Sequence, residues 1–207
     1  MNVLVLSPHT DDAELGCGAT ISRLVREGHK VSVAVFSVCD DSLPAGFATG
    51  TLRIECINSL TTLGVLEEDI IFYDYQVRVF NYARQPILDD LIQLKKKISP
   101  SLVFIPSIDD YHQDHKTIAD EGIRCFKNNC SILSYELIWN NTNFKNQIYF
   151  DLSESDINNK ISALEKYETQ KHRIYFQNNF IESLATVRGA QNGIRYAEVF
   201  EVIRYKI

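Results

Sequence analysis

Two short segments of the sequence concentrate side chains that can bind a metal ion and activate water. The first covers residues 7–14 and reads SPHTDDAE, and the second covers residues 109–115 and reads DDYHQDH. Three of the chain's five histidines lie in these two segments. A catalytic zinc site takes three protein ligands from imidazole nitrogens and carboxylate oxygens and keeps one position for water. The two segments therefore predict a metal site that hydrolyses its substrate.

The predicted metal ligands are His9, Asp12 and His115. His9 and Asp12 are three residues apart where a helix is expected to begin, so both side chains can point at one ion. His115 completes the set from the second segment. Zinc suits two imidazoles and one carboxylate, although iron, cobalt or manganese could occupy such a site.

Three neighbouring residues have predicted catalytic roles. Asp11 is the predicted general base toward water, because the metal makes that water more acidic. His112 would donate to the oxyanion or to the leaving nitrogen, and Asp114 would orient a histidine by accepting its second ring proton. A pair of aspartates at a helix start can also serve only as a cap. Two such clusters together favour the metal site.

The elements that must position these residues follow from the hydrophobic pattern. Short apolar runs alternate with amphipathic segments, which predicts an α/β sandwich around a mostly parallel sheet. We expect strands at residues 2–7, 30–36, 69–73, 101–106, 131–136, 147–150 and 198–205, and helices at residues 14–27, 51–63, 86–97, 115–127, 153–169 and 179–186.

Both metal-competent segments directly follow predicted strands, at residues 2–7 and 101–106. Because the carboxyl ends of parallel strands meet at one edge of a sheet, we expect the two segments to meet there. Residues 39–50 also follow a strand and contain Gly, Pro and Ser. This loop is either a lid over the substrate or an inert connector.

Composition narrows the class of protein. The 207 residues carry a net charge of −6, with 45% hydrophobic and 23% charged residues, which predicts one globular domain over residues 1–207. We expect no nucleic-acid partner, since a general nucleic-acid binder needs a basic face to neutralise phosphates. A local basic cluster could still bind an anionic substrate.

The sequence also bears on compartment and partners. The first apolar run, residues 3–6, lacks a basic leader and is too short for a signal peptide or a membrane span. The five cysteines form no C-x-x-C pair and are expected to be reduced. We therefore expect a cytoplasmic protein with no integral membrane segment. The oligomeric state stays open, a homo-oligomer included.

These motifs resemble those of the LmbE-like family, also called the PIG-L deacetylases. The family's A-H-P-D-D-E signature, followed by a glycine-rich helix start, is similar to SPHTDDAELGCGAT at residues 7–20, and its H-P-D-H signature is similar to HQDH at residues 112–115. Weaker similarities extend over nearly the whole chain, at residues 53–55, 63–64, 135–136, 160–170, 188–189, 193 and 196–200.

The resemblance implies a Rossmann-like three-layer fold, a zinc ion and removal of an N-acyl group. Because known members act mostly on N-acetylglucosamine-type groups, the implied substrate is a small amino sugar or a glycoconjugate. The resemblance implies the same metal ligands and the same general base as above. It also places Arg53 toward the substrate and brings Arg188 and Tyr196 within reach of the pocket. A surface ion pair of Arg53 with Glu55 or Asp41 is the alternative.

The chain departs from the family pattern at three positions. Thr10 and Gln113 replace prolines, and we expect neither change to affect the metal. Ala13 is an extra residue before Glu14, so Glu14 receives no role.

Other functions remain to be weighed. An amidase or deformylase acting on another small acylated amine would use the same site. A nucleotide-binding module would use the glycines at residues 16–18, but the strand end carries His-Thr-Asp-Asp where a dinucleotide fingerprint has its first glycine. A catalytically inactive metal-binding protein is disfavoured because the four main catalytic positions are intact.

Overall fold

A seven-stranded sheet forms the centre of the structure, a computed structural model that describes residues 1–206. The strands are β1 (Asn2–Ser7), β2 (Lys30–Val35), β3 (Ile70–Phe72), β4 (Leu102–Pro106), β5 (Ser131–Tyr135), β6 (Ile148–Asp151) and β7 (Ala197–Arg204). Their order is β3-β2-β1-β4-β5-β7-β6. The first five strands in this order are parallel, and β7 and β6 pair antiparallel. The predicted mostly parallel sheet is confirmed.

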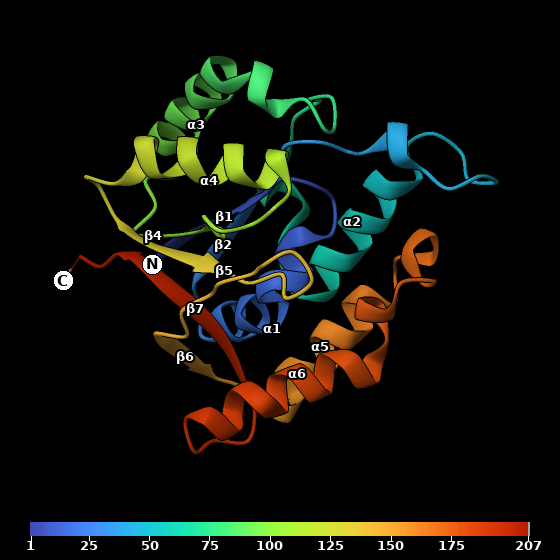
Figure 1. Ribbon diagram of the computed structural model, residues 1–207, viewed down its shortest axis with the longest axis vertical. Coiled ribbons are helices and arrows are strands. Elements are labelled where there is room, and N and C mark those ends of the chain that lie inside the picture. Colours follow the sequence, from blue (N-terminus) through green and yellow to red (C-terminus); the bar gives the residue numbers. More distant parts are fainter. Residues whose placement is uncertain (207) are drawn as a thin grey trace.

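Six α-helices of the described chain cover the sheet. They are α1 (Asp12–Arg26), α2 (Thr51–Thr62), α3 (Arg84–Ile98), α4 (Gln113–Phe126), α5 (Glu154–Leu164) and α6 (Asn178–Gln191). Helices α3 and α4 lie on one face, α1, α2 and α5 lie on the other, and α6 lies near β6 and β7 (Figure 1). This is the three-layer α/β arrangement that we predicted. Within residues 1–206, no helix combines the length and the apolarity that crossing a membrane requires.

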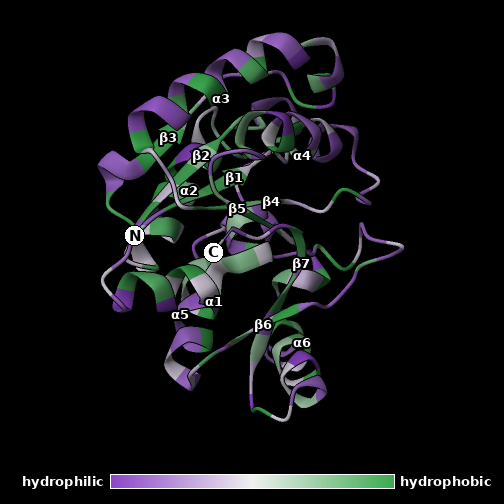
Figure 2. Cartoon of the chain, turned by 90° about the vertical axis from the view of Figure 1, so that its left-hand side faces the viewer, coloured by the Kyte–Doolittle hydropathy of each residue, from purple (hydrophilic) through white to green (hydrophobic). Residues whose placement is uncertain are grey.

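Strand β1 shows how the sequence produces the two cores. Val3 and Val5 belong to the apolar cluster that includes α1, whereas Leu4 and Leu6 belong to the cluster beneath α3 and α4. All four side chains are inaccessible to solvent. Alternating side chains of a strand point to opposite faces, and a parallel sheet covered on both faces needs apolar residues at every position. Figure 2 shows the resulting apolar centre between more polar outer helix surfaces.

The order of the strands brings the two predicted segments together. Strand β1 pairs in parallel with β2 on one side and with β4 on the other. The chain fills one half of the sheet with β2 and β3 and the other half with β4 and β5. The strand order therefore reverses its direction between β1 and β4. Ligands of open α/β sheets bind at such a reversal, beyond the carboxyl ends of the strands. Residues 7–14 follow β1 and residues 109–115 follow β4, so both lie at the reversal.

Helix α1 is interrupted shortly after its first turn. Cys17 has non-helical backbone angles, with φ −147° and ψ 25°. The backbone N–H groups of Ala19 and Thr20 instead donate to the buried Glu198 carboxylate at 3.2 and 2.7 Å. Lys160 donates to the same carboxylate at 2.7 Å. Because a buried N–H without a partner is costly, this ion pair stabilises the interruption.

The glycines at positions 16 and 18 have packing roles. A Cβ atom on Gly16 would lie 2.3 Å from the Tyr135 ring, and one on Gly18 would lie 3.1 Å from the Lys160 side chain. Both residues lie inside α1 rather than in the turn after β1. They are therefore not placed as the phosphate-binding glycines of a dinucleotide fingerprint.

The C-terminal third differs from the predicted element boundaries. The helix expected at residues 153–169 ends at Leu164, and the helix expected at residues 179–186 continues to Gln191. Between them, the irregular segment 165–177 contains two short 3-10 turns, Glu168–Gln170 and Ile174–Phe176. Gly189 lies inside α6, where its missing Cβ leaves room for the backbone of Arg195.

We predict that Gly16→Ala lowers the free energy of unfolding by about 1–3 kcal/mol, because overpacking forces neighbours to move. Tyr135 cannot move freely, since its hydroxyl donates to the Leu6 carbonyl at 2.9 Å. Urea denaturation followed by circular dichroism measures the change. Gly18→Ala serves as the comparison and should lose less, because its Cβ would come closest to the flexible stem of Lys160, at 3.1 Å. Wild-type stability in Gly16→Ala would contradict the close packing.

Candidate active site

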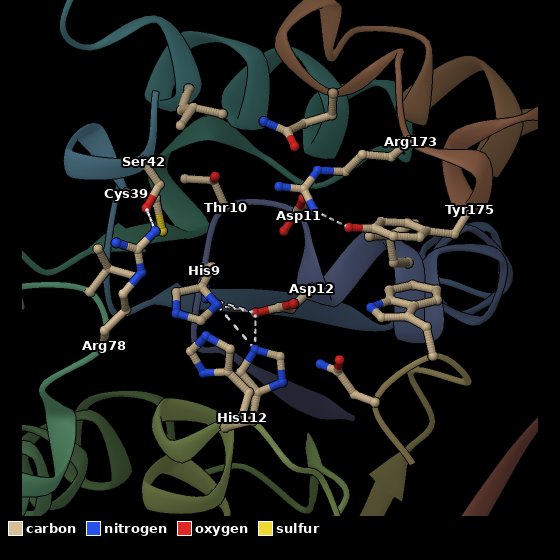
Figure 3. A pocket seen from close by; sticks show the side chains of 17 residues that line it. His9, Thr10, Asp11, Asp12, Cys39, Ser42, Arg78, His112, Arg173 and Tyr175 are labelled. Atoms are coloured by element: carbon tan, nitrogen blue, oxygen red, sulfur yellow. Dashed lines mark hydrogen bonds and ion pairs between the residues drawn. The ribbon is translucent and has the colours of Figure 1, made fainter. Parts of the chain in front are cut away.

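A cavity of about 270 Å³ lies between the segments that follow β1 and β4. Five of the six residues predicted as ligands or catalytic groups line it, and Figure 3 shows His112 facing His9, Asp11 and Asp12 from the opposite side. These five are His9, Asp11, Asp12, His112 and His115. The sixth, Asp114, is fully buried behind them.

Three side chains bring one donor atom each to a common point. Asp12 Oδ2 lies 3.1 Å from His9 Nδ1 and 3.2 Å from His115 Nε2, and the two nitrogens are 3.0 Å apart. A tetrahedral zinc ion with bonds of about 2.0–2.2 Å separates its ligand atoms by about 3.3–3.6 Å. Small movements of these side chains would therefore accommodate an ion, and the donor set fits zinc.

Each of the two histidines is held by a carboxylate at its other ring nitrogen. His9 Nε2 lies 3.1 Å from Asp114, and His115 Nδ1 lies 2.7 Å from Asp110. Metal-binding histidines usually donate their second ring N–H in this way, which fixes the tautomer and the direction of the ring. Asp114 thus has the geometry predicted for it, whereas no role was predicted for Asp110.

The charges around this point favour a cation. Burial lowers the pKa of His115, but the Asp12 and Asp110 carboxylates outweigh burial and raise it to about 10. Burial raises the pKa of Asp12, yet His115 and His9 hold it well below its usual range. A metal ion bound by the three donor atoms would satisfy the Asp12 carboxylate directly and would leave the His115 Nδ1–H to Asp110.

His112 is a third imidazole at the site. Ligand atoms of His9, His112 and His115 all lie within 4.8 Å of one another, so the three histidines could also gather around an ion. However, His112 Nδ1 accepts a hydrogen bond from the backbone N–H of Asp114, which leaves the proton of the neutral ring on Nε2. Burial and the neighbouring His115 lower the pKa of His112 to about 4. Neutral His112 is therefore a hydrogen-bond donor, and Asp12 stays the predicted third ligand.

Asp11 has a carboxylate that the helix does not use. It occupies the N-cap position of α1, but its side chain makes no capping hydrogen bond. The carboxylate faces the cavity, close to the guanidinium of Arg173 (Figure 3). Burial, together with the Asp12 carboxylate, raises the pKa of Asp11 to about 6. A carboxylate with this pKa is suited to accept and return a proton near neutral pH.

The turn between β1 and α1 fixes the direction of these side chains. Ser7 Oγ donates to the His9 carbonyl at 2.6 Å and accepts from the Ala13 N–H at 3.0 Å. The His9 N–H donates to Asp12 Oδ2 at 2.9 Å. These bonds close the turn so that His9 and Asp12 face the same point.

Arg53, predicted to face the substrate, lies outside the cavity. Its guanidinium carbon is 4.1 Å from the centre of the Phe72 ring, and neither Glu55 nor Asp41 forms an ion pair with it. The preceding residue, Leu52, lines the cavity instead. Successive helical residues point about 100° apart, so a one-residue offset is enough to turn the side chain away.

Arg188 and Tyr196 also lie away from the cavity. Arg188 donates to both oxygens of Glu136 at 2.8 and 2.7 Å, in the fork geometry of a strong ion pair. The Tyr196 hydroxyl donates to Glu182 at 2.9 Å. The structure therefore gives both residues contacts within the protein rather than in the cavity.

Other walls of the cavity come from loops in which no single residue was assigned a role, although a lid was one prediction for the loop of residues 39–50. The loop of residues 39–50 contributes Cys39 and Ser42. Further lining residues without a predicted role are Arg78, Trp139, Asn140, Gln170, Arg173 and Tyr175. Trp139 and Asn140 follow β5, so their place at a strand's carboxyl end was a usable signal.

Known proteins identify the family. Residues 4–126, more than half of the chain, match PIG-L, described as GlcNAc-PI de-N-acetylase. The chain belongs to the PIG-L family. This PIG-L protein is 26% identical over 175 residues to the uncharacterized deacetylase YaiS of Escherichia coli K12, a match that covers 81% of this chain and 90% of YaiS. Family membership and this relative make it a hydrolytic deacetylase acting on an amide bond, as the family resemblance implies.

Solved structures show the same fold. The conserved protein TT1542 from Thermus thermophilus has a TM-score of 0.82 and 19% identity, with 100% of this chain and 96% of that chain covered. The N,N'-diacetylchitobiose deacetylase from Pyrococcus horikoshii has a TM-score of 0.77 and 22% identity, with 97% and 83% covered.

We predict that Asp110→Asn weakens metal binding about 10- to 100-fold, as expected for loss of a carboxylate that orients a ligand. Competition with a calibrated chelator measures the dissociation constant. Asp109→Asn is the matched control, because the exposed Asp109 lies one residue away and forms no hydrogen bond or ion pair with His9 or His115. Equal metal affinity in the two variants would show that Asp110 does not support the site.

Proposed function

We propose that this PIG-L protein removes an N-acyl group, first of all an N-acetyl group, from an amino sugar or glycoconjugate, with zinc held by His9, Asp12 and His115. The observation that carries the proposal is the set of three donor atoms within 3.2 Å of one another, beside the Asp11 carboxylate that caps no helix. Ligands and general base together are the minimum that metal-assisted amide hydrolysis requires.

Zinc bound there supplies a Lewis acid that acidifies water and polarises the acyl carbonyl. Asp11 accepts the proton of the attacking water, for which its raised pKa suits it. His112 donates its Nε2–H to the oxyanion of the tetrahedral intermediate. Protonated Asp11 then delivers its proton to the departing amine nitrogen. Asp114 and Asp110 act on the rings of His9 and His115 and do not touch the substrate.

The proposed substrate class draws support from the cavity and from the relatives. Asn140 and Gln170 line the cavity, and their amide groups can donate to and accept from sugar hydroxyls. Trp139 adds an aromatic surface, which commonly contacts ligands in such pockets. The family description names a GlcNAc-containing substrate, and the Pyrococcus horikoshii relative is named for a chitobiose substrate.

We expect about one zinc ion per chain after purification and release of acetate from N-acetylhexosamines. Elemental analysis measures the metal, and an enzymatic acetate assay measures turnover. Prolonged chelation should abolish turnover and added zinc should restore it. Full activity in protein shown to be free of metal would contradict the mechanism. Hydrolysis confined to non-sugar amides in the same assay would contradict the substrate class.

For Asp11→Asn we expect wild-type zinc content and turnover reduced by about 10²–10⁴-fold, the usual contribution of a general base. Elemental analysis and initial rates are measured on the same preparation. Asp89→Asn, an exposed carboxylate on α3, controls for the loss of one charge. If Asp11→Asn kept wild-type turnover, Asp11 would not be the base.

A further inference from the structure

Among the described residues, Arg173 differs from most arginines in having no carboxylate partner. Of the ten arginines in the sequence, six form ion pairs with Asp or Glu: Arg23, Arg26, Arg84, Arg124, Arg188 and Arg195. Within residues 1–206, no carboxylate oxygen lies within 4.0 Å of the Arg173 guanidinium, although the side chain lines the cavity. A planar guanidinium is well suited to bind a carboxylate or phosphate.

The guanidinium of Arg173 is held in place by aromatic residues. Its Nη1 donates to the Tyr175 hydroxyl, and its central carbon lies 5.6 Å from the centre of the Tyr175 ring. The Tyr175 ring stacks on Trp139, with 3.8 Å between centroids and 9° between planes. These contacts restrict the side chain before a ligand arrives, which reduces the entropy lost on binding.

Hydrogen bonds to α2 hold the segment that carries Arg173. Glu55 on α2 is buried, and its carboxylate accepts from the backbone N–H of Thr169 at 3.1 Å and from the Thr169 hydroxyl. Thr169 lies four residues before Arg173 in the irregular segment 165–177. The buried Glu55 carboxylate therefore anchors a loop that has no regular hydrogen-bond ladder of its own.

The position of Arg173 tells which part of a substrate it would meet. Figure 3 shows its guanidinium beside Asp11, on the side of the cavity away from His112. Asp11 must reach the amine nitrogen to protonate it, whereas His112 serves the acyl oxygen. The group attached to the amine therefore extends toward Arg173.

The charge of the cavity differs from that of the whole chain. The chain carries −6, yet the charged lining residues are two aspartates and two arginines, Arg78 being the second arginine. These four charges cancel, and a divalent ion would balance the buried Asp110 and Asp114 carboxylates behind the histidine rings. A site of balanced charge does not repel an anionic ligand as the acidic chain as a whole would.

We propose that the preferred substrate is an N-acylated amine whose amine part carries an anionic group, a carboxylate or a phosphate, bound by Arg173. This inference rests on the proposed function, since it uses the same cavity and the same orientation of the amide.

The first experiment compares neutral and anionic substrates with the zinc-loaded protein. N-acetylglucosamine is the neutral compound, N-acetylglucosamine 6-phosphate and N-acetylglucosamine 1-phosphate carry a phosphate, and N-acetylmuramic acid carries a carboxylate. We expect kcat/KM at least tenfold higher for one of the anionic compounds, which also tells phosphate from carboxylate. A kcat/KM no higher for any anionic compound than for the neutral one would overturn the proposal.

The second experiment replaces Arg173. Arg173→Gln should reduce the ratio of kcat/KM values, anionic over neutral, about tenfold, mainly through KM, and Arg173→Lys should retain part of it. The matched control is Arg204→Gln, which removes an exposed arginine at the end of β7. An unchanged ratio in Arg173→Gln would place the anion elsewhere and overturn the proposal.

A binding measurement separates this proposal from the proposed function. Isothermal titration compares glucosamine 6-phosphate, glucosamine 1-phosphate and muramic acid with glucosamine, for wild type and Arg173→Gln. If none of the N-acetyl compounds is hydrolysed, the proposed function fails, and the titration still decides the role of Arg173. Tighter binding of an anionic amine that is lost in Arg173→Gln supports the proposal, and equal binding of all the amines contradicts it.

Discussion

The parallel pairing of β1 with β4 is the constraint on which the candidate site depends. The two metal-competent segments are about a hundred residues apart in the sequence, and only this pairing brings their strand ends together. On opposite sides of the pairing, β2 and β5 extend the sheet in opposite directions, which leaves a crevice above the reversal. Because apolar residues of β1 fill both cores, the position of the site is stabilised by most of the hydrophobic burial in the protein.

Two buried carboxylates convert this coarse placement into precise geometry. Asp114 accepts from His9 and from the backbone N–H groups of Arg78 and Phe80, so one side chain joins β1, α4 and the loop before α3. Arg78 adopts a left-handed backbone with φ 73°, a conformation that costs free energy in a residue other than glycine. The hydrogen bond to Asp114 offsets part of this cost. Asp114 consequently fixes both the orientation of the His9 ring and the position of Arg78 in the cavity wall. Asp110 orients the ring of His115.

Much of this site could be predicted from the sequence, for reasons that also explain the failures. The convergence of His9, Asp12 and His115 could be predicted because strand ends and metal-competent side chains can both be recognised in short stretches of sequence. The role of Asp110 could not be predicted, since one must know the path of the loop to tell which of Asp109 and Asp110 faces His115. The prediction for Arg53 was wrong because successive residues of a helix point about 100° apart. A residue next to a cavity-lining residue in the sequence can therefore point away from the cavity. The sequence did not predict that Arg173 lines the cavity. Irregular segments such as 165–177 have no periodicity that shows which side chains point toward a cavity.

The interruption of α1 at Cys17 has a consequence for how the protein is made. The N–H groups freed at the interruption are satisfied by Glu198, 179 and 178 residues further along the chain. While the ribosome is still synthesising β7, a nascent chain has its β1–α1 unit but lacks this partner. Contacts between residues so distant in sequence form late and slow folding. The hydrogen bonding of the helix that follows His9, Asp11 and Asp12 is therefore complete only once residue 198 is in place.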